Sequence, residues 1–207
     1  MNSKNGFSAS ERRILSRLNS PEKIQDFLDE LNPNLEETDY SPRNVMAEKS
    51  ADCLEGAVFA AAVLRFHGKI PLITSFYSSR DSDHVVALFK SKEHWGAISK
   101  SKYTGLCYRE PIHRNLRELV ISYFEGYFNH ASEKTLRGYC RPINLSRFDK
   151  LNWMTTLEPV TFIETHLQNV PYLDILSNGM HRSFRRVTST MRKAGEVWLV
   201  EKKVLKK

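Results

Sequence analysis

Cys53 and His84 are the two residues whose types and positions in this sequence could together perform chemistry. Cys53 begins an Ala-rich apolar run that predicts a buried helix, and His84 begins a β-branched run that predicts a strand. The start of a helix offers a partial positive charge and unpaired N–H groups, which favour a thiolate and can stabilise an oxyanion. A nearby imidazole can accept the thiol proton and later protonate a leaving amine. The pair therefore indicates nucleophilic attack by a cysteine on a carbonyl carbon.

Other features of the sequence favour a simpler interpretation. The carboxylate of Asp52 adjoins Cys53, and it raises the pKa of the thiol unless it points away. A single cysteine in an Ala-rich helix is usually a small buried hydrophobic residue, and a histidine at the end of a strand can simply border a turn. The two remaining cysteines, Cys107 and Cys140, belong to no motif, so we expect them to be structural.

The elements that would position the pair are a helix and three strands. The helix is expected to begin at Cys53 and to stop at Gly68, and the strands to cover 72–77, 84–89 and 94–98. Turns of hairpin length join these strands, so the pattern predicts an α+β fold in which an antiparallel sheet packs on a central Cys-bearing helix. Additional helices are expected at both ends, over 10–18, 21–31, 115–128 and 161–176, with a break near Pro171, a loop over 34–49 and a short strand or helix over 197–200.

Three short motifs around this helix and these strands carry further information. They are Asp52-Cys53 with an Ala-rich helix closing on Gly68-Lys69-Ile70-Pro71, then Asp83-His84-Val85-Val86-Ala87-Leu88, and then His94-Trp95-Gly96-Ala97-Ile98. In this order the motifs resemble the transglutaminase-like superfamily, a branch of the papain-like cysteine-peptidase fold, over about residues 45–105. The resemblance implies a transglutaminase/papain-like fold and amide chemistry on a peptide or protein substrate. It also implies a thioester intermediate on Cys53, with His84 as the base, followed by hydrolysis or by transfer to an amine.

The third catalytic position departs from the pattern of the superfamily. An aspartate that orients the imidazole is expected about fifteen residues after His84, and Ser99 stands there instead. Ser99 could supply a weaker hydrogen bond, or the orienting group could be Asp81, Asp83 or Asn115. We therefore predict a cysteine-dependent amide hydrolase or acyltransferase with Cys53, His84 and Ser99 as its catalytic residues. The alternative is a non-catalytic transglutaminase-like binding module that keeps the fold and lacks the acid.

The net charge of +7 over 207 residues is concentrated at one end of the sequence. Nine basic and two acidic residues lie between His181 and Lys207, so the first 180 residues carry no net charge. We therefore expect a single domain over 1–180, which includes the N-terminal helices, and a basic C-terminal segment over 181–207. The simplest interpretation of this segment is a solvated face. The alternative is a weak contact with a polyanion, without any motif for sequence-specific binding of nucleic acid.

Cofactors, metals, membranes and disulfides are not expected. His67, His94 and His113 do not have the spacing of metal ligands, and no motif for a cofactor is present. No apolar run reaches the length of a membrane helix, and the first residues lack the apolar core of a signal peptide. Three cysteines without a CxxC motif fit reduced thiols. We therefore expect a cytoplasmic protein.

Overall fold

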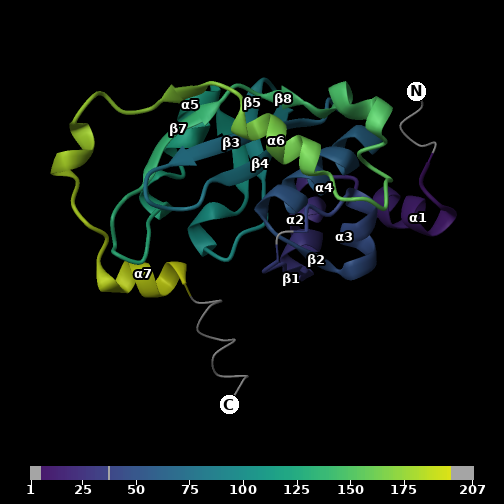
Figure 1. Ribbon diagram of the computed structural model, residues 1–207, viewed down its shortest axis with the longest axis horizontal. Coiled ribbons are helices and arrows are strands. Elements are labelled where there is room, and N and C mark those ends of the chain that lie inside the picture. Colours follow the sequence, from purple (N-terminus) through teal and green to yellow (C-terminus); the bar gives the residue numbers. More distant parts are fainter. Residues whose placement is uncertain (1–5, 37, 197–207) are drawn as a thin grey trace, which may run out of the picture.

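The computed structural model describes residues 6–36 and 38–196, and it has a mixed α+β architecture built on one main sheet (Figure 1). The strands of this sheet pair antiparallel in the order β6-β5-β4-β3-β7-β9, and β8 also pairs with β3. They are β3 (Leu72–Ser78), β4 (His84–Ser91), β5 (His94–Ile98), β6 (Arg109–His113), β7 (Leu136–Cys140), β8 (Ile143–Asn144) and β9 (Tyr172–Asp174). Strand β4 therefore lies in the interior of the sheet, and its first residue, His84, pairs with Phe76 of β3.

Helix α4 (Cys53–Phe66) packs on the sheet chiefly against β4, and three N-terminal helices pack around it, as the group labelled α1–α4 in Figure 1 shows. These are α1 (Ala9–Arg17), α2 (Pro21–Glu30) and α3 (Pro42–Glu48). A short parallel pair, β1 (Asn32–Pro33) and β2 (Ser50–Ala51), joins the loops beside them. Helices α5 (Leu116–Ile121), α6 (Thr161–Gln168) and α7 (Ser189–Gly195) follow the hairpins. Within the described ranges, no helix is long and apolar enough to cross a membrane.

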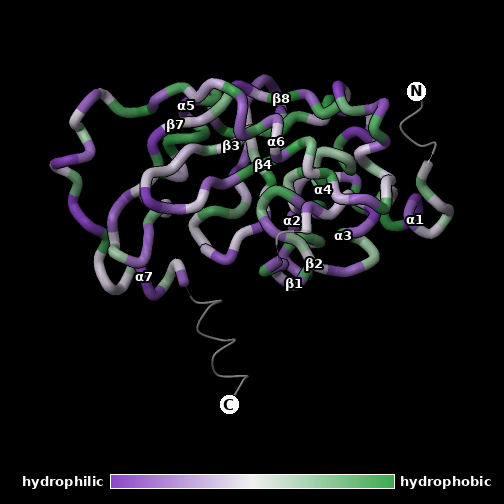
Figure 2. The backbone as a smooth tube through the Cα atoms, viewed as in Figure 1, coloured by the Kyte–Doolittle hydropathy of each residue, from purple (hydrophilic) through white to green (hydrophobic). Residues whose placement is uncertain are grey.

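Strand β4 is buried on both of its faces. Val85, Ala87 and Phe89 belong to the hydrophobic cluster that contains α4. Val86 and Leu88 point the other way, into a second cluster that includes side chains of α5 and of the residues after it. Figure 2 shows the corresponding hydrophobic stretches of the chain around α4 and β4. Because both faces are covered, the strand appears in the sequence as a continuous apolar run and not as an alternating one.

The side chains of Asp52 and Glu55 cap the N-terminus of helix α4. The side chain of Asp52 accepts a hydrogen bond from the N–H of Glu55 at 2.8 Å, and the side chain of Glu55 accepts one from the N–H of Asp52 at 2.9 Å. This reciprocal arrangement is a capping box, and it satisfies two N–H groups that a helix start leaves unpaired. The cap fixes Cys53 as the first residue of the helix.

Gly56 allows α4 to approach the segment that follows β5. A methyl group on Gly56 would lie 2.6 Å from Cβ of Lys100, which is closer than two carbon atoms can pack. The alanines of α4 serve the same purpose farther along the helix, where Ala57, Ala60 and Ala61 are fully buried. Small side chains on this face therefore bring the first turn of the helix close to the sheet.

The secondary structure differs from the sequence prediction in several places, and three of them concern predicted helices and loops. Residues 34–49 contain helix α3, which begins with Ser41 as N-cap and Pro42 at the first position. The helix predicted over 161–176 ends at Gln168, and strand β9 follows Pro171 and extends the sheet. The helix predicted over 115–128 is shorter, since α5 gives way to a 3₁₀ turn at Phe124–Gly126. The element predicted over 197–200 lies outside the described residues.

Gly56→Ala is expected to destabilise the protein by about 1–3 kcal/mol, because the added methyl group overpacks the contact with Lys100. In an uncrowded helix the same change would stabilise by about 0.5–1 kcal/mol, so the sign of the effect is informative. Denaturant unfolding measures it. The control is Gly68→Asn, at a left-handed position with a φ of 80° and no atom within 4 Å, where a near-neutral effect is expected. A stabilising Gly56→Ala would contradict the close approach.

Candidate active site

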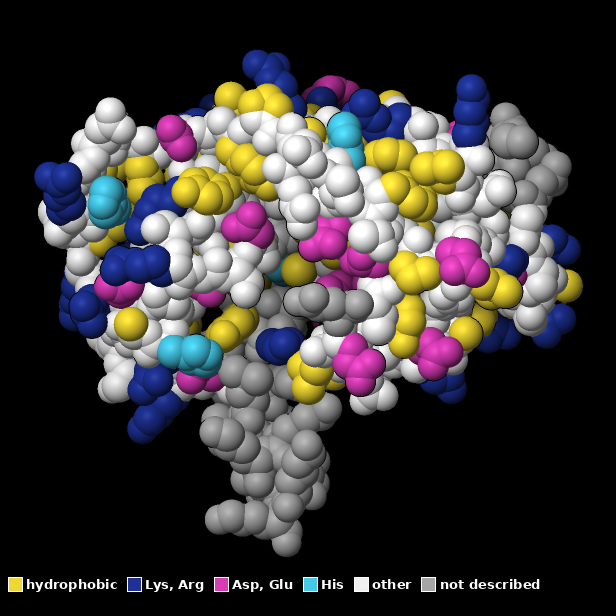
Figure 3. Space-filling model, in the orientation of Figure 1, with side chains coloured by type: hydrophobic (Ala, Val, Ile, Leu, Met, Phe, Trp, Pro, Cys, Tyr) yellow, Lys and Arg dark blue, Asp and Glu magenta, His cyan; other side chains and the backbone are white. Residues whose placement is uncertain are grey.

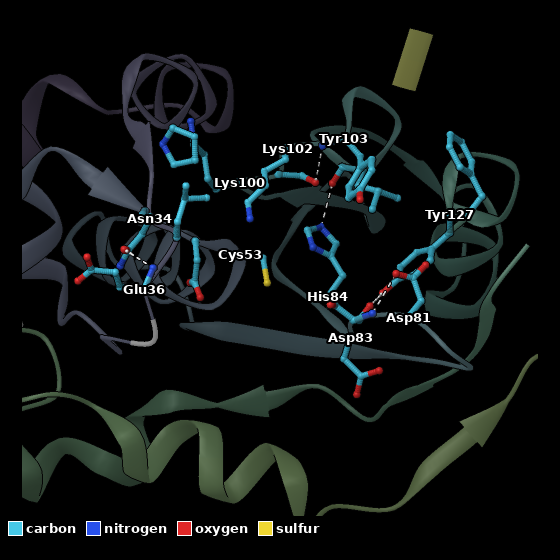
Figure 4. A pocket seen from close by; sticks show the side chains of 18 residues that line it. Asn34, Glu36, Cys53, Asp81, Asp83, His84, Lys100, Lys102, Tyr103 and Tyr127 are labelled. Carbon is cyan, nitrogen blue, oxygen red and sulfur yellow. Dashed lines mark hydrogen bonds between the residues drawn. The ribbon is translucent and has the colours of Figure 1, made fainter. Parts of the chain in front are cut away.

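Cys53 and His84 line the same pocket, which has a volume of about 390 Å³. Its walls come from the start of α4, the turn between β3 and β4, the segment after β5 and the loop around residue 35. In Figure 4 the thiol of Cys53 and the ring of His84 lie beside each other at the centre of the pocket. His84 is only 4% exposed, and Cys53 is half-buried. The structure therefore brings together the first residue of α4 and the first residue of β4, as the sequence analysis expected.

The first turn of α4 supplies hydrogen-bond donors beside the sulfur. The first bond within the helix runs from the N–H of Gly56 to the carbonyl of Asp52, and the N–H of Glu55 is held by the cap. The side chain of Asp52 also attracts the N–H of Leu54, so among these first-turn groups the N–H of Cys53 is the one for which the described residues supply no oxygen partner. Unpaired N–H groups at a helix start can hold an anion or a developing oxyanion. Such donors are what an attack by Cys53 on a carbonyl carbon requires.

A buried carboxylate fixes the pocket wall on the helix side. Glu55 is fully buried and accepts hydrogen bonds from Asn34 Nδ2 at 3.0 Å, Thr38 Oγ1 at 2.6 Å and the N–H of Tyr40 at 2.7 Å. Together with the N–H of Asp52, these donors occupy both oxygens of the carboxylate. The loop that contains Asn34 is thereby tied to the first turn of α4, next to Cys53.

The group that holds the ring of His84 is a backbone carbonyl. Nε2 of His84 lies 2.9 Å from the carbonyl oxygen of Leu106, and a dashed line marks this bond at the ring in Figure 4. Oγ of Ser99 donates to the same oxygen at 2.7 Å. Because a carbonyl only accepts, Nε2 carries the proton of the neutral ring, and Nδ1 keeps a lone pair. Nδ1 has no hydrogen-bond partner in the described part of the chain. Ser99 therefore lies next to His84 in the fold and shares an acceptor with it, without bonding to the ring.

The carboxylates and the amide considered as alternatives to Ser99 make other contacts. Asp83 Oδ1 accepts from the N–H of Ser78 at 2.9 Å, and Asp81 Oδ2 accepts from Thr135 Oγ1 at 2.6 Å, so both build the turn before β4. Asn115 caps helix α5 through a bond from the N–H of Glu118 at 2.9 Å. None of the three holds Nε2 of His84, which is occupied by Leu106.

Residues 99 and 100 are anchored to helix α2. Gln25 binds the backbone of Ser99 twice: its Oε1 accepts from the N–H of Ser99 at 3.1 Å, and its Nε2 donates to the carbonyl at 2.9 Å. Nζ of Lys100 donates to the carbonyls of Leu28 and Leu31, each at 2.7 Å, at the end of α2. Lysine side chains at a helix C-terminus satisfy carbonyls that lack a partner within the helix. The lysine next to Ser99 is therefore a helix cap, although it borders the pocket.

The thiol and the imidazole are both neutral in the resting site. Burial raises the pKa of Cys53 to about 12, and the carboxylate of Asp52 raises it further, while backbone N–H groups including that of Val85 oppose the rise. Burial lowers the pKa of His84 to about 4, against the effect of its bond to Leu106. Because the thiol pKa is far above that of the ring, no thiolate–imidazolium pair forms at rest. The proton must move from Cys53 to His84 during attack on a substrate.

Acidic side chains dominate the charge of the pocket. Its lining carries the carboxylates of Glu36, Asp52, Asp81 and Asp83 and the amines of Lys100 and Lys102. Figure 3 shows acidic side chains gathered near the middle of this face of the molecule, with basic ones mainly toward the sides. Burial and the charge of Glu55 raise the pKa of Asp52 to about 6. The surroundings of Cys53 therefore disfavour a thiolate above this pH.

The described part of the basic C-terminal segment packs on a wall of the pocket. Thr104 Oγ1 donates to the carbonyl of Ala194 in α7 at 3.1 Å. The ring of Phe128, which lines the pocket, lies against the backbone of Gly195. Arg186 donates to the carbonyl of Ala131 at 3.1 Å. Helix α7 thus covers the outer side of the wall that carries Phe128 and Thr104.

The sequence analysis missed the residue that orients His84. The Leu106 carbonyl belongs to a 3₁₀ turn, Thr104–Leu106, and a backbone group leaves no residue-type signal in a sequence. The one hint in the sequence is the density of Tyr, Gly and Arg over residues 103–111, a pattern that fits a loop covering the cleft or a packed connection. Comparison with known proteins adds no assignment: no known family matches the chain, and no curated protein is significantly similar to it. The chemistry of the site therefore rests on its geometry.

Glu55→Gln is expected to destabilise the protein by about 1–3 kcal/mol, because an amide NH₂ at either oxygen position would face a donor and leave it unpaired. Urea unfolding measures the loss. Glu48→Gln, on the exposed surface of α3, is the matched control and should change stability by less than about 0.5 kcal/mol. Equal, small effects of both changes would contradict the role given to Glu55.

Alkylation of Cys53 by iodoacetamide is expected to accelerate steadily from about pH 6 to about pH 9, because the thiol remains largely protonated over this range. Asp52→Asn keeps the cap and removes the charge, so it should speed the reaction several-fold at about pH 8 and have little effect at about pH 5, where Asp52 is protonated. Intact mass with peptide mapping follows the reaction, and exposed Asp174→Asn is the control. An alkylation rate that is already independent of pH near pH 6 would show a pre-formed thiolate–imidazolium pair and would contradict the prediction.

Proposed function

We propose that the protein is a cysteine-dependent amide hydrolase or acyltransferase with a transglutaminase-like, papain-like architecture. The observation that carries the proposal is the bond from His84 Nε2 to the Leu106 carbonyl, on a pocket shared with Cys53. This bond leaves Nδ1 as the ring atom that can accept the thiol proton. The order of elements, a Cys-bearing helix and then antiparallel strands beginning at His84, also supports the proposal. The proposed substrate is an amide of a peptide or protein.

In the proposed reaction, Sγ of Cys53 attacks the amide carbon while Nδ1 of His84 takes the thiol proton. A C–S bond forms, and the π electrons of the carbonyl move onto its oxygen, where the N–H group of Cys53 can stabilise the charge. Collapse of this intermediate breaks the C–N bond, and His84 gives its proton to the leaving amine. The thioester is then cleaved by water or by a second amine, whose proton passes to His84 and back to the sulfur.

The second candidate function is a binding module without catalysis. The observation that favours it is the neutral Leu106 carbonyl at the position where a carboxylate would stabilise an imidazolium. The high pKa of the Cys53 thiol and the low pKa of His84 point the same way. In this function the pocket would receive a peptide segment without attacking it.

Labelling with a thiol-reactive probe tests the proposed chemistry. With iodoacetamide at about pH 8, Cys53 is expected to react faster than Cys107 and Cys140, and His84→Ala should slow it about tenfold or more by removing the base. Cys53→Ala should abolish the fast adduct in the intact mass, and Cys107→Ala, at a thiol outside the pocket, should retain it. If Cys53 reacts no faster than the other two and His84→Ala changes nothing, the proposed function fails.

Ser99→Asp separates the two candidate functions. The Ser99 hydroxyl and Nε2 of His84 donate to the same carbonyl oxygen. A carboxylate at position 99 can therefore accept a hydrogen bond from the Nε2–H group and stabilise the imidazolium. The change should raise the pKa of His84 and speed labelling of Cys53 if the pair is chemically competent. A binding module predicts unchanged labelling in a variant that folds normally, as measured by circular dichroism.

A further inference from the structure

One guanidinium holds the backbone around the group that orients His84. Arg109, the first residue of β6, donates to the carbonyls of Gly105 at 2.6 Å, Tyr108 at 2.9 Å and Cys107 at 3.3 Å. These are the carbonyls on either side of Leu106. A guanidinium has five N–H donors in a rigid plane, so a single arginine can hold several carbonyls in one geometry.

The carbonyl of Leu106 is not bound by Arg109 and points instead to His84 and Ser99. Adjacent peptide groups whose carbonyls are held fix the direction of the peptide between them, because a rotation of that peptide would break the neighbouring bonds. The direction of the Leu106 carbonyl is therefore set by the bonds of Arg109 to the residues that flank it.

The guanidinium of Arg109 packs on the ring of Tyr123. The Cζ atom of Arg109 lies 3.8 Å from the centre of the Tyr123 ring, and the hydroxyl of Tyr123 donates to the carbonyl of Cys107 at 3.1 Å. Tyr123 is fully buried. Nε of Arg109 also donates to Oγ of Ser122 at 3.1 Å. Stacking on an aromatic face and a second set of bonds leave the side chain of Arg109 little freedom.

We propose that Arg109 is a positioning residue of the Cys53–His84 site, which holds the Leu106 carbonyl against Nε2 of His84 and so selects the tautomer with a basic Nδ1. This inference rests on the proposed function for its catalytic meaning. Arg109 takes over a task that a carboxylate performs in a triad, because it orients the imidazole through the backbone. It does not touch the thiol or the substrate.

The charge of Arg109 has a second effect on the ring. Burial lowers the pKa of His84 most, the bond to Leu106 opposes this, and the guanidinium lowers the pKa further. The rings packed around His84 are those of Phe76, Tyr123 and Tyr127, and burial raises the pKa of both tyrosines, so they remain uncharged. The other ionisable groups that line the pocket are Glu36, Asp52, Cys53, Asp81, Asp83, Lys100, Lys102 and Tyr103. Loss of Arg109 should therefore raise the pKa of His84 as well as loosen its orientation.

Nitrogen NMR of the histidine rings tests the proposal without depending on catalysis. The protein is labelled with ¹⁵N-histidine, and His84 is assigned among the seven histidines by comparison with His84→Ala. The wild type is expected to show one tautomer, protonated at Nε2, above about pH 6. Arg109→Met should give a mixture of tautomers and a raised pKa, with Cys53 alkylation slowed about tenfold or more.

Two further variants make the result specific. Arg109→Lys keeps the charge and cannot hold three carbonyls, so it should also give a mixture of tautomers, with a smaller change in the pKa of His84. The same variant provides the test if Arg109→Met does not fold. Arg117→Met removes another arginine that binds a backbone carbonyl, that of Ile175, and should leave His84 unchanged.

A single Nε2-protonated tautomer in folded Arg109→Met or Arg109→Lys would overturn the proposal, as would a mixture in the wild type. Equal effects of Arg109→Met and Arg117→Met on the tautomer would also overturn it, since they would show a general loss of structure. If the wild-type tautomer depends on Arg109 but Cys53 alkylation does not depend on His84, the proposed function fails and the positioning role stands.

Discussion

The burial of the first turn of helix α4 is the constraint on which the site depends. Gly56 and the alanines bring the helix close to the sheet and to Lys100, and the capping box of Asp52 and Glu55 fixes where it begins. Burial places the backbone N–H groups of Cys53, Leu54 and Val85 beside the sulfur, which favours an anion, but it also removes the sulfur from water. Desolvation has the larger effect, because the pKa of Cys53 is raised to about 12 in spite of these donors. The same packing that creates the site therefore keeps its thiol protonated.

The hydrogen-bond partner of His84 is a neutral carbonyl, and the imidazole stays uncharged just as the thiol stays protonated. A carboxylate at Nε2 would stabilise the imidazolium and shift the proton from the sulfur to the ring before any substrate arrives. Burial lowers the pKa of His84 to about 4, and the carbonyl of Leu106, which orients the ring, stabilises the charged form too little to offset this effect. A site of this kind contains no thiolate–imidazolium pair before a substrate binds. Attack and proton transfer would have to occur together, and an electrophilic substrate carbonyl held by the N–H group of Cys53 would be needed to drive the transfer.

The sequence could predict the parts of the fold that local signals specify. The Ala-rich apolar run from Cys53, the stop at Gly68 and the apolar runs on both sides of the turn before His84 were enough to place α4 and the three central strands. Strand β6, which follows the 3₁₀ turn, was not predicted, because its alternating half-exposed residues give no apolar run. Ser99 was placed near His84 by its spacing. Its role was not, since a shared bond to a main-chain oxygen depends on tertiary contacts such as those of Arg109.

The distribution of charge is another property that the sequence alone does not place in space. Counted along the sequence, residues 1–180 are neutral and the excess of positive charge belongs to 181–207. In the fold, the neutral part has an acidic pocket, and the described part of the basic segment packs against the wall of that pocket through Ala194 and Gly195. The hydrogen bond from Thr104 to Ala194 also ties α7 to the Thr104–Leu106 turn, whose last carbonyl holds His84. Two parts that the charge count along the sequence separates are therefore joined in the fold next to the group that orients the imidazole.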